Sequence, residues 1–555
     1  MMAGAPEWLQ RRIPLIGWLD RSDRGSRRAD VLAGLTVAAM LVPQGMAYAA
    51  LAGMPPVAGL YASTVPLVAY ALLGTSGQLA FGPVAIVSLL TASTLAPLAD
   101  GDPGTYIALA GVLALLVGAL QLVLGLLRAG RLTGLLSHPV VSGFTSAAAI
   151  VIATSQLDKL FGLDIGRPEG WLERITAIFA ALNATNAATL TVGVLAIAGL
   201  VLGRRLGNRV PVPLLVVVLA TAAVPLLGLQ DAGVAVLGEV PGGFPLPGVP
   251  SASLDQVVAL LPGAAIIALL SYLEGISVAR AIAVRTRDRI DPDQELIASG
   301  AANLTAGLVQ AFPVAGGFSR TAVNHEAGAR SPLASLVTAA GVLLALLLLA
   351  PLFTTLPEVV LAAVVLVAVT KLVDVREAIH AWRVERTDGL ALTITFLATL
   401  LIGVEIGIGI GIATSLVLSL WRVGIPRITV DTRDGATVLT VEGDLLPASG
   451  VRLLDFVEEE LDRRSEPEAG GPLVLDLAGV PSADLSGLQS LAAVDAACSA
   501  AGVRLHVVGL RDGVLRPFDR AHLGRRFEGR VHADVPTATR AARLTDEMSG
   551  RLPAL

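Results

Sequence analysis

The residues with the clearest chemical potential lie at 311–330, which read AFPVAGGFSRTAVNHEAGAR. This stretch is part of a hydrophobic region, yet it contains Pro313 and the pair Gly316-Gly317, with Ser319 and Arg320 where a helix can begin. Glycines ahead of a helix start allow a close approach of the backbone, and the free N–H groups and dipole of a helix N-terminus favour an anion. The stretch therefore predicts half of an anion site inside a bilayer.

A second break of similar composition lies in the first half of the chain. Residues 81–85 read FGPVA inside the third hydrophobic span, and the tripeptide Pro-Val-Ala recurs at 313–315, also close behind a phenylalanine. Each tripeptide falls in the third span of a set of seven. Because seven is odd, two equivalent sets must enter the membrane from opposite sides. Matching broken segments in such an inverted repeat indicate a transport site.

The two breaks would bring two helix N-termini together near the middle of the membrane. Backbone N–H groups around Val84 and Ala85, and those of residues 318–320, would then surround an anion. Each helix end contributes roughly half a positive charge. Two such ends and the guanidinium of Arg320 suit a divalent oxyanion better than a neutral solute, and the hydroxyl of Ser319 can donate one hydrogen bond.

The elements that must hold these breaks are membrane helices. Of the 555 residues, 54% are hydrophobic and 15% are charged, against about 25% charged in soluble domains. Residues 31–99 contain no Asp, Glu, Lys or Arg. Fourteen spans of about 20 apolar residues, some of them broken, are expected. They fall near 30–52 (interrupted at 43–45), 56–73, 78–98, 105–127, 132–155, 186–203, 211–228, 254–284, 292–310, 311–330, 332–352, 357–370, 388–403 and 405–421, with an interfacial helix at 168–181.

The basic residues predict the orientation. Arginines crowd the first 29 residues, and the later basic clusters then all fall on the same face, whereas the opposite loops carry mainly Asp and Glu. The positive-inside rule therefore places both termini in the cytoplasm of a multi-pass protein of the cytoplasmic membrane. The expected domains are a cytoplasmic N-terminal segment (1–29), a first repeat (30–228), a second repeat (254–422) and a soluble C-terminal domain (427–555).

The C-terminal domain is predicted as a small α/β fold. Short apolar runs at 428–432 and 436–441 flank Asp434-Gly435, which is typical of a hairpin. Further strands are expected at 473–477 and 504–508, and helices at 450–464, 485–501, 511–519 and 534–548. Alternation of strands and helices implies a sheet with helices packed against it.

Several long motifs carry a resemblance that covers nearly the whole chain. They are DVLAGLTVAAMLVPQGMAYAALAGMPPVAGLYAS (30–63), FGPVAIVSLL (81–90), LSHPVVSGFTSAAAI (136–150), LEGISVARAIA (273–283) and FPVAGGFSRTAVN (312–324). The sequence resembles the SulP anion transporters, the sulfate permease and anion exchanger family, and its tail is similar to their STAS domain. The resemblance implies a polytopic α-helical 7+7 inverted repeat like that of nucleobase transporters, an anion between two half-helices, alternating access by an elevator or rocking motion, and a homodimer with cytoplasmic STAS domains.

Motif matches add further site residues. Gln44 and Tyr48 of the first span should line the same pocket, with Phe318 as an apolar wall. Glu274 is a lone carboxylate in an apolar span, which costs about 2.5–3.5 kcal/mol on insertion, so it needs a cation partner or a proton. The resemblance implies a coupling role, because plant-type proton/sulfate symporters carry a Glu and an Arg at the motif positions of Glu274 and Arg320. The leading hypothesis is proton-coupled sulfate uptake, in which protonation of Glu274 frees Arg320 to bind sulfate.

Structural interpretations stand beside these functional ones. Pro313 and Gly316-Gly317 are also compatible with a kinked, closely packed helix. Glu274 and Arg320 could form a purely structural ion pair, and Ser319 could bond its own helix. Asn303, Gln310 and Glu326 are expected to be helix–helix contacts, and His138 a structural residue at a helix start. Ser486 matches the phosphorylated serine of anti-sigma-factor antagonists, although a helix cap is the favoured interpretation.

The same scaffold could carry bicarbonate or C4-dicarboxylates, or act as an anion exchanger or channel. A sensor with the tail as its output is a further alternative. An enzyme is not expected, because the sequence holds no metal cluster, nucleophile–base pair or phosphate loop. The single Cys498 excludes an internal disulfide. No cofactor, metal or nucleic acid is predicted; the expected partners are the anion, a proton, the lipid bilayer and a second copy of the chain.

Overall fold

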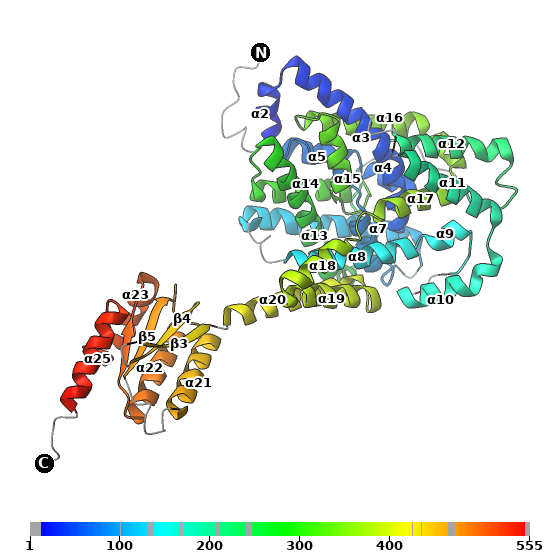
Figure 1. The fold of residues 1–555 in the computed structure, drawn as a ribbon. Coiled ribbons are helices and arrows are strands. Elements are labelled where there is room, and N and C mark those ends of the chain that lie inside the picture. Colours follow the sequence, from blue (N-terminus) through cyan, green and yellow to red (C-terminus); the bar gives the residue numbers. More distant parts are fainter. Residues whose placement is uncertain are drawn as a thin grey trace. The chain divides into compact units, whose positions relative to one another are not determined.

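The computed structural model describes residues 13–99, 101–130, 137–166, 168, 170–203, 205, 211–238, 243–244, 247–424, 426–433, 436–463 and 472–549. The chain forms two compact units, Met1–Ser415 and Leu416–Leu555. The first is helical and the second contains a sheet (Figure 1). The predicted turn at Asp434-Gly435 lies outside the described residues.

The helices of the first unit follow the expected spans. In chain order they are α2 (Pro14–Arg21), α3 (Arg24–Leu51), α4 (Pro56–Tyr61), α5 (Val65–Leu73), α6 (Ala85–Leu95), α7 (Pro103–Leu126), α8 (His138–Thr154), α9 (Leu157–Phe161), α10 (Trp171–Ala181), η2 (Leu182–Ala184), α11 (Ala187–Gly203), α12 (Val212–Leu227), α13 (Leu254–Thr286), α14 (Pro292–Leu308), α15 (Phe318–Glu326), α16 (Leu333–Leu349), η4 (Ala350–Thr355), α17 (Glu358–Val369), α18 (Val375–Val384), α19 (Arg386–Leu401) and α20 (Val404–Gly424), which continues into the second unit.

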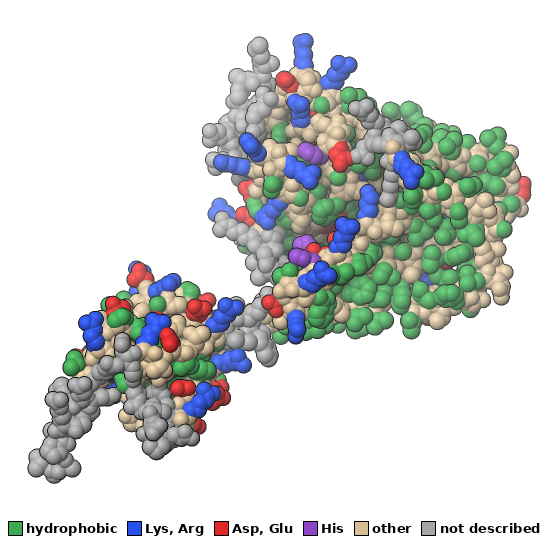
Figure 2. All heavy atoms as spheres, in the orientation of Figure 1, with side chains coloured by type: hydrophobic (Ala, Val, Ile, Leu, Met, Phe, Trp, Pro, Cys, Tyr) green, Lys and Arg blue, Asp and Glu red, His purple; other side chains and the backbone are tan. Residues whose placement is uncertain are grey.

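Length and composition mark many of these helices as membrane-spanning. Within the described residues, six segments are long and apolar enough to cross a bilayer, and the pair α10–α11, bent by 118°, makes up to seven. Four shorter apolar helices, α6, α12, α17 and the first part of α20, add to them. Hydrophobic side chains cover a broad face of this unit (Figure 2). Each expected span contains a helix, while the crossing number of fourteen stays a prediction.

One expected detail, the interruption of the first span, differs from the structure. The first span is not interrupted at residues 43–45, because Pro43 lies inside the continuous helix α3. A proline removes one backbone donor without ending this helix. The next turn packs closely on α4, since a Cβ on Gly59 would overlap the carbonyl oxygen of Gly45. The second expected span, Pro56–Leu73, is long and apolar enough to cross a bilayer and consists of α4 and α5, with Pro66 in the first turn of α5.

The helices pack as two bundles. The first bundle contains α3–α7 and α13–α16, with α7 against α14 and α3 against α16 as its main pairs. The second bundle contains α8, α9, α11, α12 and α17–α20; in it α8 packs on α19, α11 packs on α17, and α20 packs on α19 at Gly407 and Gly411. Helices α12 and α17 reach α3, and α8 reaches α6, so the bundles meet around α3 and α6.

The second unit is a five-stranded sheet in the order β3-β4-β5-β6-β7. The strands are β3 (Arg427–Arg433), β4 (Ala436–Glu442), β5 (Leu473–Gly479), β6 (Leu505–Val508) and β7 (Val531–His532), and only β3 runs antiparallel to its neighbour. Its helices are α21 (Pro447–Arg463), α22 (Leu485–Ala500), α23 (Asp512–Arg520), α24 (Leu523–Arg526) and α25 (Val535–Ser549). Helices α21–α24 share one core with the sheet, and α25 packs on the opposite face. The predicted elements are confirmed; β7 and α24 were too short to predict.

Candidate anion-binding site

The two breaks form a short antiparallel ladder. Strand β1 (Phe81–Gly82) pairs with β2 (Ala315–Gly316), so that Phe81 faces Gly316 and Gly82 faces Ala315. Glycine is required on both strands. Gly82 has φ +148°, a conformation that strains other residues, and a Cβ on Gly316 would lie 2.9 Å from the Cα of Gly275 in α13. The ladder therefore lies directly against the helix that carries Glu274.

A helix starts immediately after each strand. The N-caps are Val84 for α6 and Gly317 for α15, and neither has a side-chain capping bond. The first intrahelical bonds run from the N–H of Ser88 to Val84 and from the N–H of Thr321 to Gly317. The N–H groups of residues 85–87 and 318–320 therefore precede both hydrogen-bond ladders, and two positive helix ends begin side by side.

The predicted tripeptide echo is not the true correspondence between the halves. Pro83 immediately precedes the N-cap Val84, whereas Pro313 lies four residues before the N-cap Gly317. The two Pro-Val-Ala sequences are thus three residues out of register. Each of the two predicted segments does contain a break, because in both a short strand is followed by a helix start.

One face of α15 binds the backbone of the first break. Arg320 Nη1 donates to the carbonyl of Pro83 at 2.6 Å. Thr321 Oγ1 accepts from the N–H of Ala80 at 3.0 Å, and Asn324 Nδ2 donates to the carbonyl of Gln78 at 2.8 Å. These three residues share a helix face, because positions three and four apart are neighbours. Besides the backbone ladder, these side chains of the second half therefore hold the two breaks together.

Arg320 is the principal charge at this junction. Its side chain is 3% exposed, and among the described residues its Nε and Nη2 have no hydrogen-bond partner. A buried guanidinium with unsatisfied donors is costly unless an anion or water accepts from them. Arg320 thus offers two free donors and a positive charge next to both helix starts.

Glu274 lies nearby without contacting Arg320 directly. It is half-buried on α13, and Glu274, Arg320 and Tyr48 are close enough to influence one another's charge. In the described part of the chain, no ion pair within 4.0 Å and no hydrogen bond joins Glu274 to Arg320. The arginine instead bonds Pro83, so the direct pair considered from sequence is not formed in this structure.

A cavity of about 150 Å³ opens between the two bundles and reaches Ser319, the residue before Arg320. Gln44 of α3 and Ser319 of α15 line it from the first bundle. The second bundle contributes residues of α11, α12 and α17, and Lys371, just beyond α17, supplies a cation. The cavity therefore extends from one predicted half-helix start to an exposed lysine.

The predicted site residues divide into exposed and buried groups. Phe318 is 51% exposed, and Ser319 is exposed at the cavity. Val84 and Ala85 are 5% and 8% exposed, and Tyr48 is also buried and does not line the cavity. The second break is thus the one that faces the cavity. Its local conformation is a strand followed by a helix start, not the kinked helix considered above.

Ser486 in the second unit has a different position from the one expected of a cap. Asp484 is the N-cap of α22 and accepts from the N–H of Gly487 at 2.8 Å, while Ser486 lies half-buried in the first turn. His138 begins α8, as expected, with Nδ1 3.4 Å from Glu377 Oε1.

Several residues that build the site were not predicted from the sequence. Thr321 and Asn324 were not singled out, although their spacing from Gly317 marks one face of a short helix, and Gln121 and Lys371 were also overlooked. Asn303 was expected to be a helix–helix contact, and it does join helices, but it also bonds the backbone of the second break. Polar side chains inside apolar helices were the available signal.

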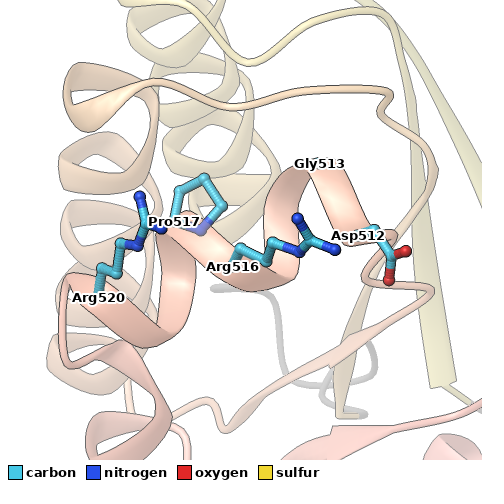
Figure 3. A pocket seen from close by; sticks show the side chains of 5 residues that line it. All are labelled: Asp512, Gly513, Arg516, Pro517 and Arg520. Carbon is cyan, nitrogen blue, oxygen red and sulfur yellow. The ribbon is translucent and has the colours of Figure 1, made fainter.

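A larger hollow lies in the second unit, on α23. It has a volume of about 420 Å³ and is lined by Asp512, Gly513, Arg516, Pro517 and Arg520 (Figure 3). Arg516 and Arg520 are exposed and one helical turn apart. Surface arginines in open solvent are well hydrated, and Asp512 lies beside them. This hollow is therefore a weaker anion site than the cavity at Ser319, despite its size.

The fold and the site define a helical membrane protein in which two half-helix starts meet beside a cavity. Residues 28–395 match the model of the sulfate permease family, and residues 428–529 match that of the Mlab STAS domain. The chain belongs to the sulfate permease family and carries a C-terminal STAS domain.

Two relatives are similar over most of this chain. The chloroplastic sulfate transporter 4.1 of Arabidopsis thaliana is 40% identical over 443 residues, which are 78% of this chain and 64% of that protein. A probable sulfate transporter of Mycobacterium tuberculosis is 39% identical over 403 residues, 73% of this chain and 72% of that protein.

Solved structures share the fold. Murine Solute Carrier 26 family member A9, an anion transporter, has a TM-score of 0.88 at 24% identity, covering 98% of this chain and 96% of that chain. The transmembrane domain of a cyanobacterial bicarbonate transporter, BicA, has a TM-score of 0.61 at 22% identity, covering 71% of this chain and 98% of that domain.

Proposed function

We propose that this protein takes up sulfate across the cytoplasmic membrane, coupled to protons, by alternating access. The observation that carries the proposal is the buried guanidinium of Arg320, which has two unsatisfied donors and adjoins two helix N-termini. A tetrahedral dianion can accept from the guanidinium and from backbone N–H groups together. The names of the relatives as sulfate transporters support the same substrate.

Glu274 supplies the coupling to protons. It lies in an apolar helix without an ion-pair partner among the described residues, so its charged form is costly in a membrane. We infer that it binds a proton when sulfate binds, which removes a negative charge close to the incoming dianion. Release of the proton on the other side restores the repulsion and favours release of sulfate.

The cavity marks the path to the cytoplasm. Lys371 and the start of α12 line it, and the positive-inside rule assigns those segments to the cytoplasmic face. In this proposal the cavity, which Gln44 and Ser319 line, opens towards the cytoplasm, as expected of an inward-facing state. The proposed assembly is a homodimer in the bilayer, with both termini and the STAS domains in the cytoplasm.

Uptake into proteoliposomes tests the coupling. Wild-type protein should accumulate radiolabelled sulfate when the external side is made acidic. Glu274→Gln, which mimics the protonated form, should lose accumulation driven by the pH gradient but keep exchange of sulfate for sulfate at equal pH. Glu358→Gln, another half-buried glutamate in an apolar helix, is the matched control. Full gradient-driven accumulation by Glu274→Gln would show that the coupling role is wrong.

Bicarbonate and C4-dicarboxylates are the alternative substrates, since a bicarbonate transporter shares this fold. A sodium-coupled bicarbonate site would be expected to offer short oxygen ligands in place of Arg320, whereas a dicarboxylate would suit the arginine equally. Competition of sulfate uptake by bicarbonate and by fumarate at two pH values distinguishes the three. Flux far above carrier rates would instead indicate a channel.

A further inference from the structure

We propose that Asn303 is a positioning residue that holds the second break in the register the anion site needs. The inference rests on the proposed anion transport, but it concerns a side chain outside the cavity. Asn303 is fully buried on α14. Its Oδ1 accepts from the N–H of Val314 at 2.8 Å, and its Nδ2 donates to the carbonyl of Val314 at 3.1 Å. One amide thus satisfies both polar groups of a single residue, as a neighbouring strand would.

The second break needs this support because its own pairing is short. The ladder between β1 and β2 is two residues long, and Val314 lies immediately before it. Short isolated ladders are marginally stable, and a slip by one residue moves the backbone by about 3.3 Å. Such a slip would displace the N–H groups of residues 318–320 and the guanidinium of Arg320. Asn303 on one side and β1 on the other therefore fix the start of α15.

The orientation of the Asn303 amide is set by the backbone it binds. The N–H of Val314 can only donate and its carbonyl can only accept, so Oδ1 and Nδ2 have one possible arrangement. The Nδ2 group also donates to Gln121 Oε1 at 3.0 Å. Gln121 Nε2 in turn donates to Ser271 Oγ at 2.8 Å and to the carbonyl of Ala268 at 2.9 Å. The network thus runs from Asn303 on α14 through Gln121 on α7 to α13, while Asn303 Nδ2 also lies 3.1 Å from the carbonyl of Ser299 on its own helix.

This network connects the two functional parts of the site. Ser271 lies one helical turn before Glu274 on α13, and Val314 leads into the break that carries Arg320. Asn303, Gln121 and Ser271 are all buried. Buried networks with every member paired make their surroundings rigid. The proton-binding helix and the anion-binding break are therefore held as one body, through residues that touch neither ligand.

The test compares three variants of the full-length protein. Asn303→Leu keeps the size but loses both bonds to Val314. Asn303→Asp can replace both bonds when its carboxyl is protonated, through C=O and O–H, but loses the donor when ionised. Thr338→Val is the matched control, because the Thr338 hydroxyl is a buried donor to the carbonyl of Gly34 at 3.0 Å, away from the break.

The readouts are the KM and Vmax for sulfate in proteoliposomes and the stabilisation of purified protein by sulfate against heat. Loss of two neutral hydrogen bonds should raise the KM of Asn303→Leu about tenfold or more. Thr338→Val should lose thermal stability with an unchanged KM. For Asn303→Asp, the ratio of its KM to the wild-type KM should be near one in acid and rise with pH.

An unchanged KM in Asn303→Leu, or an equal rise in Thr338→Val, would overturn the proposal in favour of a merely structural contact. The same holds if the Asn303→Asp ratio does not change with pH. The substrate is tested separately by including bicarbonate and fumarate in the heat-stabilisation assay. If wild-type protein prefers one of these, the sulfate assignment is wrong, while Asn303→Leu should still weaken the preferred anion.

Discussion

The two half-helix starts, at α6 and α15, have the same backbone plan but different surroundings. Both follow a two-residue strand, lack a side-chain cap and leave their first N–H groups ahead of the helical ladder. The start of α6 is buried, with Val84 5% exposed, and contributes no polar side chain in its first three residues, Ala85, Ile86 and Val87. The start of α15 lines the cavity with Ser319, and the polar side chains of Arg320 and Thr321 follow directly.

The difference indicates how an inverted repeat acquires a function. Counting from the N-caps, Val87 of α6 corresponds to Arg320 of α15, and Ser88 corresponds to Thr321. Thr321 bonds the opposite break, while the Ser88 hydroxyl has no partner among the described residues. The first half supplies backbone groups that are bound, and the second half supplies the side chains that bind them. The repeat therefore provides two helix ends, and the asymmetric side chains provide charge and selectivity.

The largest effect on sulfate uptake should come from removing the charge of Arg320, compared with a substitution at the corresponding residue Val87. Arg320→Gln removes the cation beside a dianion and should lower sulfate uptake at least about a hundredfold, since charge-assisted bonds are roughly twice as strong as neutral ones. Val87→Ala removes buried methyl groups and should cost about 1–2 kcal/mol of stability with little change in KM. Uptake kinetics and thermal unfolding should be measured for both variants. Equal losses of affinity would mean that the two half-helices contribute alike.

An intermediate effect on sulfate binding is expected when the glycines of the β1–β2 ladder are replaced by alanine. Gly316→Ala would place a methyl group 2.9 Å from the Cα of Gly275, so α13 or the break must shift. Gly82→Ala has room for its Cβ but must adopt φ +148°, at a cost of about 1–3 kcal/mol. Both should raise the sulfate KM, Gly316→Ala the more. Gly409→Ala, whose Cβ would meet nothing within 4 Å, is the control. A wild-type KM in Gly316→Ala would show that the ladder tolerates displacement.

Much of this arrangement could be predicted from sequence, for physical reasons that also mark the limit. Gly316-Gly317 and residues 81–85 identified both breaks, because proline with glycine can interrupt a helix, although the same signal at residues 43–45 predicted a break that is absent from α3. Arg320 and Glu274 were found because charges are rare in membranes. The direction in which Arg320 extends was not predictable, since the carbonyl of Pro83 and the carboxylate of Glu274 are both suitable acceptors. The role of Asn303 required knowing that α14 passes beside Val314, which no local pattern encodes.

The smallest effect on sulfate transport is expected from a substitution at the far end of α6. This end lies about 16 Å from the start of the helix, at 1.5 Å per residue. There the carboxylate of Glu405, on α20 of the second bundle, accepts from the hydroxyls of Ser93 and Thr94. The polar contacts of α15 described above instead stay within the first bundle, where Asn324 bonds Gln78. Helix α6 therefore connects the two bundles, and this contact should resist their relative movement.

Glu405→Ala tests that assignment. Both hydroxyls also bond the carbonyl of Leu90, so no buried donor is left unsatisfied and the protein should fold normally. The Vmax for sulfate should change about two- to threefold, the effect of one modest hydrogen-bonded contact, while the KM stays at the wild-type value. A rise in KM comparable to that of Arg320→Gln would contradict the comparison, because α6 would then influence anion binding through its far end as strongly as α15 does through its side chains.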